Sequence, residues 1–225
     1  MYHKLVLAIP HSTRVIKTAW SDSALVGVDA DRWTDWYTDK MFGSVLSNVD
    51  VVIGDVSRFD CDLERLKNDP LEAIGQGILY TRSHSGATRL LDGETEASLL
   101  AHWYSYQDRL SDALVSNSLI IDCHSFPADV YDVDICVGFN NDTSKPDDSI
   151  IQLIVEHFKW YGYSVGVNVP YSNSITPPAP VEYHSVMIEL NKRIYFNEND
   201  LKLKPFAYKV EHCISALYPK LLKQK

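Results

Sequence analysis

The sequence predicts an α/β fold with a mostly parallel or mixed central sheet and helices on both of its faces. Short apolar runs recur along the chain, and they alternate with longer segments in which apolar residues are spaced three or four apart. Continuous apolar runs are typical of strands buried on both faces, and such strands need helices packed on each side. Nothing in the composition marks a boundary, so we expect a single domain over residues 1–225.

Six apolar runs are expected to form the sheet. Residues 5–9 end at Pro10 and are followed by His11, and residues 118–123 are followed by His124. Residues 185–190 contain Glu189 near their end. The other expected strands are residues 49–53, 134–139 and 164–169.

Helical periodicity is clearest over residues 94–115, where Asp92 or Thr95 is suited to cap the first turn. Two more helices are expected over residues 148–161, stopping near Gly162, and over residues 205–222. The acidic segment 29–39 is expected to open a further helix, because carboxylates at a helix start complement its dipole. Residues 171–180 contain three prolines and are expected to form a loop that borders a pocket.

The charge balance argues against some classes of partner. Acidic residues outnumber basic ones by 30 to 21, and the net charge of -9 disfavours nucleic acid and anionic membranes. The short basic tail, residues 220–225, is interpreted as the end of a helix. The apolar run in the first ten residues is too short for a signal peptide or a membrane span, so we expect a cytoplasmic protein. Four cysteines without paired spacing are expected to be reduced core residues: Cys61, Cys123, Cys136 and Cys213.

Three polar residues, His11, His124 and Glu189, lie at or just after the ends of expected strands. Because parallel strands bring their carboxyl ends to one edge of a sheet, we expect these side chains to converge there. Two neutral imidazoles and a carboxylate match the ligand preference of zinc and leave a position for water. Asp35 or Asp39 is the natural third ligand if its segment begins beside His11, and neither spacing nor chemistry selects between them.

Five short motifs, in order along the chain, resemble those of the N-formylglutamate amidohydrolase family, which is similar in turn to zinc carboxypeptidases and aspartoacylase-type deacylases. Residues 9–12 (IPHS) resemble the family's IPHSG, residues 34–39 (TDWYTD) its TDWhvD, and residues 57–65 (SRFDCDLER) its SRyviDlNR. Residues 122–125 (DCHS) resemble DaHS, and residues 187–195 (MIELNKRIY) resemble iqlElaqraYm. The resemblance covers most of the chain and implies a phosphorylase/hydrolase-like fold of the zinc carboxypeptidase kind.

The resemblance also implies roles for particular residues. Zinc, or another divalent metal, would be held by His11, Asp35 and His124. Glu189 would act as a general base toward water and then as an acid toward the leaving amine. Asp122 is suited to orient a metal ligand from behind. The implied reaction is hydrolysis of the amide C–N bond of a small anionic N-acyl amino acid such as N-formyl-L-glutamate.

Four arginines are candidates for binding the substrate. Arg58 and Arg65 match arginines of the family motif, which implies contacts with the substrate carboxylate or with the developing oxyanion. Ordinary surface ion pairs with Asp60, Asp62 or Glu64 are the structural alternative for these two. The weaker candidates are Arg82 and Arg193, and His84 beside Arg82 is interpreted as a loop residue rather than a ligand.

Two positions depart from the family pattern. Thr13 stands where a glycine is usual, and Glu64, where an asparagine is usual, adds a carboxylate next to Arg65. These departures motivate a second hypothesis, a ligand-binding module that keeps the fold and the metal but lacks turnover. A serine hydrolase that uses Ser12 or Ser125 is disfavoured, because the chain has no G-x-S-x-G motif.

Overall fold

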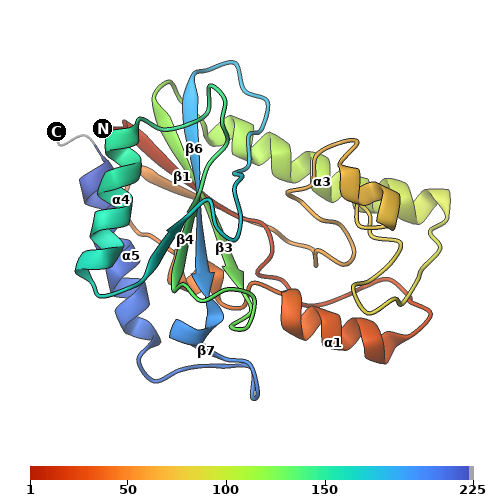
Figure 1. Cartoon of the computed structure of the whole chain (residues 1–225). Coiled ribbons are helices and arrows are strands. Elements are labelled where there is room, and N and C mark those ends of the chain that lie inside the picture. Colours follow the sequence, from red (N-terminus) through yellow and green to blue (C-terminus); the bar gives the residue numbers. More distant parts are fainter. Residues whose placement is uncertain (223–225) are drawn as a thin grey trace.

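A six-stranded sheet forms the centre of the computed structural model, which describes residues 1–222. The strand order is β2-β1-β3-β6-β4-β5 (Figure 1). Neighbours in the first four positions are parallel, β4 is antiparallel to β6, and β5 is parallel to β4. All six expected strands are present, and the sheet is mostly parallel with one antiparallel pairing, as predicted. Their bounds are β1 Lys4–Ile9, β2 Val49–Ile53, β3 Ser118–Phe126, β4 Ile135–Gly138, β5 Val165–Val167 and β6 Tyr183–Asn191.

Alternating side chains of the central strands build one core on each face of the sheet. In β1, Leu5 and Leu7 belong to the core under α4 (Asp148–Trp160) and α5 (Ala207–Leu221). Val6 and Ala8, which point the other way, pack in the core under α3 (Gly93–Ala113). Figure 1 shows α4 and α5 on one side of the sheet and α3 on the other, so the prediction of helices on both faces is confirmed.

The helix boundaries follow local capping signals. Asp92 caps α3, because its side chain accepts a hydrogen bond from the Thr95 N–H at 2.8 Å. After α4 the chain turns at Gly162, whose φ of +89° is a conformation that favours glycine. The last helix, α5, ends at Leu221. The basic tail was interpreted as a helix end, and its residues 223–225 lie outside the described residues.

The acidic segment 29–39 does not open a helix, and that prediction is wrong. Helix α1 (Ser23–Trp33) begins earlier, where the Asp22 side chain accepts hydrogen bonds from two N–H groups of the first turn. The segment therefore contains the end of α1, a loop and the first two residues of the single turn α2 (Thr38–Met41). The cap of the helix is Asp22, seven residues before Asp29, because its carboxylate accepts from the N–H groups of Ala24 and Leu25. Asp35 consequently lies in a loop, and its N–H donates to the carbonyl of His11 at 3.0 Å.

The remaining segments are irregular or short. Residues 171–180 have no regular secondary structure, as predicted. Helical turns η1 (Pro70–Ile74) and η2 (Lys192–Ile194) and the small hairpin of β7 (Phe196–Asn197) and β8 (Lys202–Leu203) complete the chain. All four cysteines are free and buried, which agrees with their expected place in the core.

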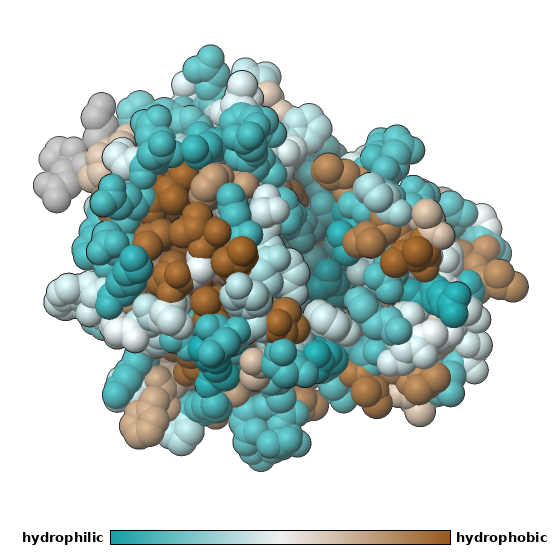
Figure 2. All heavy atoms as spheres, viewed as in Figure 1, coloured by the Kyte–Doolittle hydropathy of each residue, from teal (hydrophilic) through white to brown (hydrophobic). Residues whose placement is uncertain are grey.

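The surface is mostly polar on the face shown in Figure 2, where apolar residues gather over the region of α4 and the neighbouring edge of the sheet. Among residues 1–222, none of the helices has the length and apolar character that crossing a membrane requires.

Candidate active site

The strand ends bring His124 and Glu189 side by side. His124 of β3 is the register partner of Glu189 of β6 in the parallel pairing. Their sequence neighbours Cys123 and Ile188 belong to the core under α4 and α5, so His124 and Glu189 face the other side of the sheet. His11 follows the end of neighbouring β1 by two residues. The predicted convergence at the carboxyl edge is therefore present.

Asp35 lies between the two histidines. Its Oδ2 atom is 3.0 Å from Nδ1 of His124 and 3.7 Å from Nδ1 of His11. All three side chains are buried, and each residue exposes 3% or less of its surface. Asp39, the other candidate, is exposed on α2. The fold thus places Asp35, and not Asp39, next to His11 and His124.

Each imidazole contacts a second carboxylate through its Nε2 atom. His11 Nε2 is 2.8 Å from Asp62 Oδ1, and His124 Nε2 is 2.8 Å from Asp122 Oδ1. When Nε2 donates its hydrogen to such a carboxylate, the lone pair of the ring lies on Nδ1, which is the atom that faces Asp35 in both histidines. The sequence predicts this orienting position for Asp122, but for Asp62 it indicates only ion pairs with the arginines; the contact of Asp62 with His11 is visible only in the structure.

These residues fit a divalent metal. His11 Nδ1 is buried and has no hydrogen-bond partner within residues 1–222, which is a costly arrangement unless another group satisfies it. His11, His124 and Glu64 also offer ligand atoms that all lie within 4.8 Å of one another. Nitrogen ligands combined with carboxylate oxygens are the donor set that zinc prefers. Two carboxylates, Asp35 and Glu64, are thus within reach of the histidine pair.

Burial and charge shift the pKa values of this group of residues. Burial, followed by the charges of Asp35 and Glu64, raises the pKa of Glu189 to about 8. Burial opposes ionisation of Asp35 as well, but its contacts with His11 and His124 outweigh that effect and hold its pKa below the usual range. Burial alone would lower the pKa of His124, and the carboxylates of Glu64 and Asp122 raise it instead.

Arg58 and Arg65 share one carboxylate, that of Asp62. Arg58 Nη2 is 3.2 Å and Arg65 Nε is 3.7 Å from Asp62 Oδ2, and the Tyr80 hydroxyl donates to the same oxygen at 3.3 Å. Because Asp62 also contacts His11, it links the arginines to the histidine pair. Asp62 is 1% exposed, so these are not the surface ion pairs considered as the alternative.

A cavity of about 280 Å³ opens onto these residues. His84 lies in its wall, stacked on Trp33 with ring centroids 4.7 Å apart, which agrees with its interpretation as a loop residue. Burial, followed by the charge of Arg58, lowers the pKa of His84 to about 4. The other lining residues are Asp35, Arg58, Glu64, Arg65, Leu71, Gln76, Tyr80, His124, Ser125, Phe126, Tyr171, Asn173, Met187 and Glu189.

The two weaker arginine candidates lie elsewhere. Arg82 is exposed and forms a β-bridge with Thr88. Arg193 pairs with Asp132 at 2.5 Å and with Asp134 at 3.0 Å. Within the part of the chain that the structure describes, neither side chain lines the cavity.

The two departures from the family pattern have different surroundings. The Thr13 hydroxyl donates to the carbonyl of Gly54 at 3.1 Å, so it supports the turn after β1. Glu64 lines the cavity, and its Oε2 is 3.4 Å from His124 Nε2. Of the two, only Glu64 is in a position to meet a ligand in this cavity.

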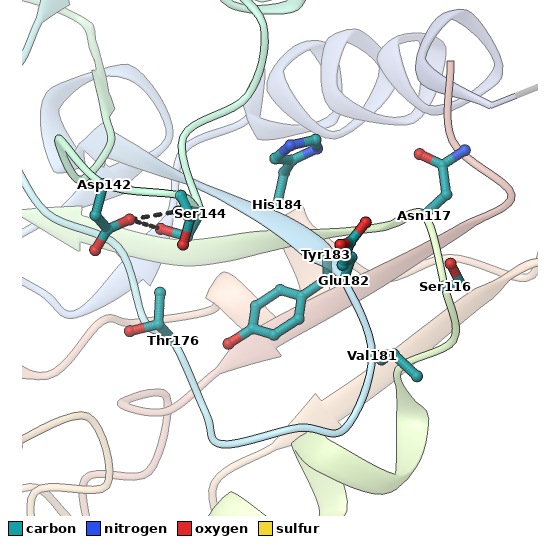
Figure 3. Close-up of a pocket in the computed structure, with 10 residues that line it drawn as sticks. Ser116, Asn117, Asp142, Ser144, Thr176, Val181, Glu182, Tyr183 and His184 are labelled. Atoms are coloured by element: carbon teal, nitrogen blue, oxygen red, sulfur yellow. Dashed lines mark hydrogen bonds between the residues drawn. The ribbon is translucent and has the colours of Figure 1, made fainter.

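A second hollow, of about 670 Å³, lies at the opposite edge of the sheet, where β3 and β6 begin (Figure 3). Its polar side chains are spread along the hollow (Figure 3). The carboxylate of Asp142 already accepts a hydrogen bond from the Ser144 hydroxyl at 2.6 Å. The histidine and carboxylate groups of the first cavity converge on one point, and we therefore take that cavity as the candidate active site.

The fold and the site define an α/β protein with a candidate metal centre at the carboxyl edge of its sheet. The model of one hydrolase family, N-formylglutamate amidohydrolase, matches residues 3–196, a range that includes every residue of this centre. The chain belongs to the N-formylglutamate amidohydrolase family. This confirms the resemblance inferred from the sequence motifs.

Solved structures show the same fold. The N-formylglutamate amidohydrolase from Ralstonia eutropha JMP134 superposes with a TM-score of 0.79 at 16% identity, over 98% of this chain and 93% of that chain. A gene product from Agrobacterium tumefaciens superposes with a TM-score of 0.62 at 15% identity, over 97% of this chain and 90% of that chain. No curated protein matches the sequence.

Proposed function

We propose that this protein is a metal-dependent amidohydrolase that cleaves the amide C–N bond of an N-acylated amino acid, the reaction represented in its family by N-formyl-L-glutamate. The observation that carries the proposal is the convergence of His11, Asp35 and His124 beside Glu189, next to a cavity that two arginines line. This set combines metal ligands, a proton acceptor and cations for an anionic substrate in one place.

His11, Asp35 and His124 would hold the metal, for which zinc is the first candidate and another divalent cation the second. When bound, such a cation supplies a Lewis acid that polarises the acyl oxygen and acidifies water. Asp62 and Asp122 orient the two imidazoles through Nε2, so that both Nδ1 atoms face the same point.

Glu189 moves the proton. Its Oε2 atom is buried and has no hydrogen-bond partner among the described residues, so it is available to accept a proton from the attacking water. Burial and the nearby carboxylates of Asp35 and Glu64 raise its pKa, which increases its affinity for that proton. The same carboxyl group then delivers the proton to the leaving amine nitrogen.

Arg58 and Arg65 bind the anionic end of the substrate. Both guanidinium groups line the cavity, and each of them contacts the carboxylate of Asp62. A guanidinium binds a carboxylate with two parallel hydrogen bonds, a geometry that also fixes the orientation of the substrate.

Metal analysis combined with an activity assay tests this function. The assay follows amine release from a panel of N-formyl-L-amino acids that includes the glutamate and glutamine derivatives. Glu189→Gln should keep its metal and lose about 100-fold or more in kcat, whereas Asp35→Asn should lose the metal. Asp39→Asn, which changes the exposed neighbour on α2, is the matched control and should retain both.

Full activity in Glu189→Gln, or full activity after the metal has been removed by a chelator, would contradict the proposed mechanism. Binding of metal and of N-formyl amino acids without any product release would instead assign the protein to the class of ligand-binding modules.

A further inference from the structure

The charges around the cavity are unusually acidic for a site that binds an anion. Arg58 and Arg65 are its only lysine or arginine side chains within residues 1–222, while Asp35, Glu64 and Glu189 all line it. Both arginines also contact the buried carboxylate of Asp62. Carboxylates therefore outnumber the guanidinium groups that line this cavity.

Both arginines already have partners within the protein. Arg65 contacts Asp62, the Oδ2 of Asp69 at 3.8 Å and the Tyr80 hydroxyl at 3.5 Å. Arg58 contacts Asp62 and donates to the carbonyl of Trp33 at 3.4 Å. One substrate carboxylate, the α-carboxylate common to all N-acyl amino acids, can still be bound by the remaining N–H groups. A second carboxylate would have no free arginine or lysine in this cavity, as far as the described chain extends.

Glu64 is the carboxylate that a substrate side chain would meet. Its side chain is 18% exposed, whereas that of Asp35 is 2% exposed. It is adjacent in sequence to Arg65 and projects into the same cavity. An anionic group that approaches Arg65 therefore also approaches Glu64. Arg65 attracts such a group, whereas the carboxylate of Glu64 repels it.

The rest of the lining is neutral. Gln76, Asn173 and Tyr171 offer amide and hydroxyl groups, and Leu71 and Met187 offer apolar contact. These groups suit a side chain that carries an amide, a hydrocarbon or a positive charge better than one that carries a carboxylate.

We propose that Glu64 sets the substrate class: the protein acts on N-acyl amino acids whose side chains are neutral or cationic, and Glu64 excludes those with an acidic side chain. This inference rests on the proposed function and narrows it, since Glu64 is a specificity-determining residue for the same reaction.

The test compares N-formyl-L-glutamine with N-formyl-L-glutamate, which have nearly the same shape and differ in charge. The wild-type kcat/KM should be at least about tenfold higher for the glutamine derivative. In Glu64→Gln this ratio should fall at least about tenfold, because the opposing carboxylate is gone. Glu72→Gln, which neutralises an exposed glutamate on η1, is the matched control and should leave the ratio unchanged.

Equal or better use of N-formyl-L-glutamate by the wild type, or a ratio that Glu64→Gln does not change, would overturn the inference. If no member of the panel is hydrolysed, the proposed function fails, but the charge preference is still measured by ligand-induced rises in Tm. L-Glutamine should then raise the Tm of the metal-loaded wild type more than L-glutamate does, and equal rises would overturn the inference.

Discussion

Glu189 shows how a single buried carboxyl group is altered by its surroundings. It is 8% exposed, and burial together with Asp35 and Glu64 raises its pKa from 4.5 to about 8. In the metal-free protein, the folded state therefore holds this proton at pH values where the unfolded chain has released it. The stabilising contribution of the protonated form is complete below the ordinary pKa and is lost as the pH rises through the folded-state value.

The raised pKa of Glu189 predicts how the stability of the metal-free protein changes with pH. Glu189→Gln removes the ionisable group, so the variant should become more stable than the wild type as the pH rises, by on the order of 2 to 4 kcal/mol at about pH 9. The difference should be small near pH 4.5, the ordinary value. Urea unfolding of both proteins across this range measures it. A difference that stays constant with pH would show that Glu189 does not titrate in this way.

Arg89 and Asp60 form a buried ion pair that joins segments of the cavity wall. Arg89 Nη1 is 3.3 Å from Asp60 Oδ1, and neither side chain is exposed. Asp60 also accepts a hydrogen bond from the Lys17 N–H at 2.6 Å, and the Arg89 guanidinium lies over the Trp20 ring. These contacts connect the loop after β1 to the segments that present Arg58 and His84 to the cavity.

Removing one partner of this pair should be costly, because the other charge stays buried. We expect Asp60→Ala to lower the free energy of unfolding by roughly 3 to 5 kcal/mol. Asp50→Ala, which breaks the partly exposed pair of Lys4 and Asp50, is the control and should cost about 1 kcal/mol or less. Urea unfolding measures both, and equal losses in the two variants would argue against a special role for the buried pair.

The proposed metal ligands come from distant parts of the molecule. His11 follows β1, Asp35 lies between α1 and α2, and His124 belongs to β3. Their ligand atoms meet only when the sheet has formed and the loop after α1 has folded back onto it. A cation at this site would therefore bind the folded chain and not the unfolded one.

Metal binding should accordingly stabilise the whole protein. At a zinc concentration about 100 times Kd, the free energy of unfolding should rise by about 2.7 kcal/mol, and the Tm should rise with it. A chelator should reverse the effect. Asp35→Asn should abolish the rise, whereas Asp39→Asn should keep it. A Tm that is the same with and without zinc in the wild type would contradict metal binding at this site.

Much of the fold could be predicted from the sequence because its signals are local. Apolar runs mark all six strands, and three- and four-residue spacing marks α3, α4 and α5 to within a few residues. The sequence places His11, His124 and Glu189 at or just after the ends of strands. Because these strands are parallel, their ends lie at one edge of the sheet, and the three residues meet there. The error at residues 29–39 arose where a loop and two short helices meet without a clear periodicity.

The sequence by itself determined the sheet, its covering helices and the histidine pair, through periodicity, strand direction and family motifs. The tertiary structure decided which polar groups stand around that pair. It brought Asp35 and Asp62 to the histidines, turned Glu64 into the cavity and left Arg82 and Arg193 outside it. The physical reason is that these contacts join residues far apart in the chain through irregular loops, whose course depends on packing and buried hydrogen bonds rather than on any local pattern.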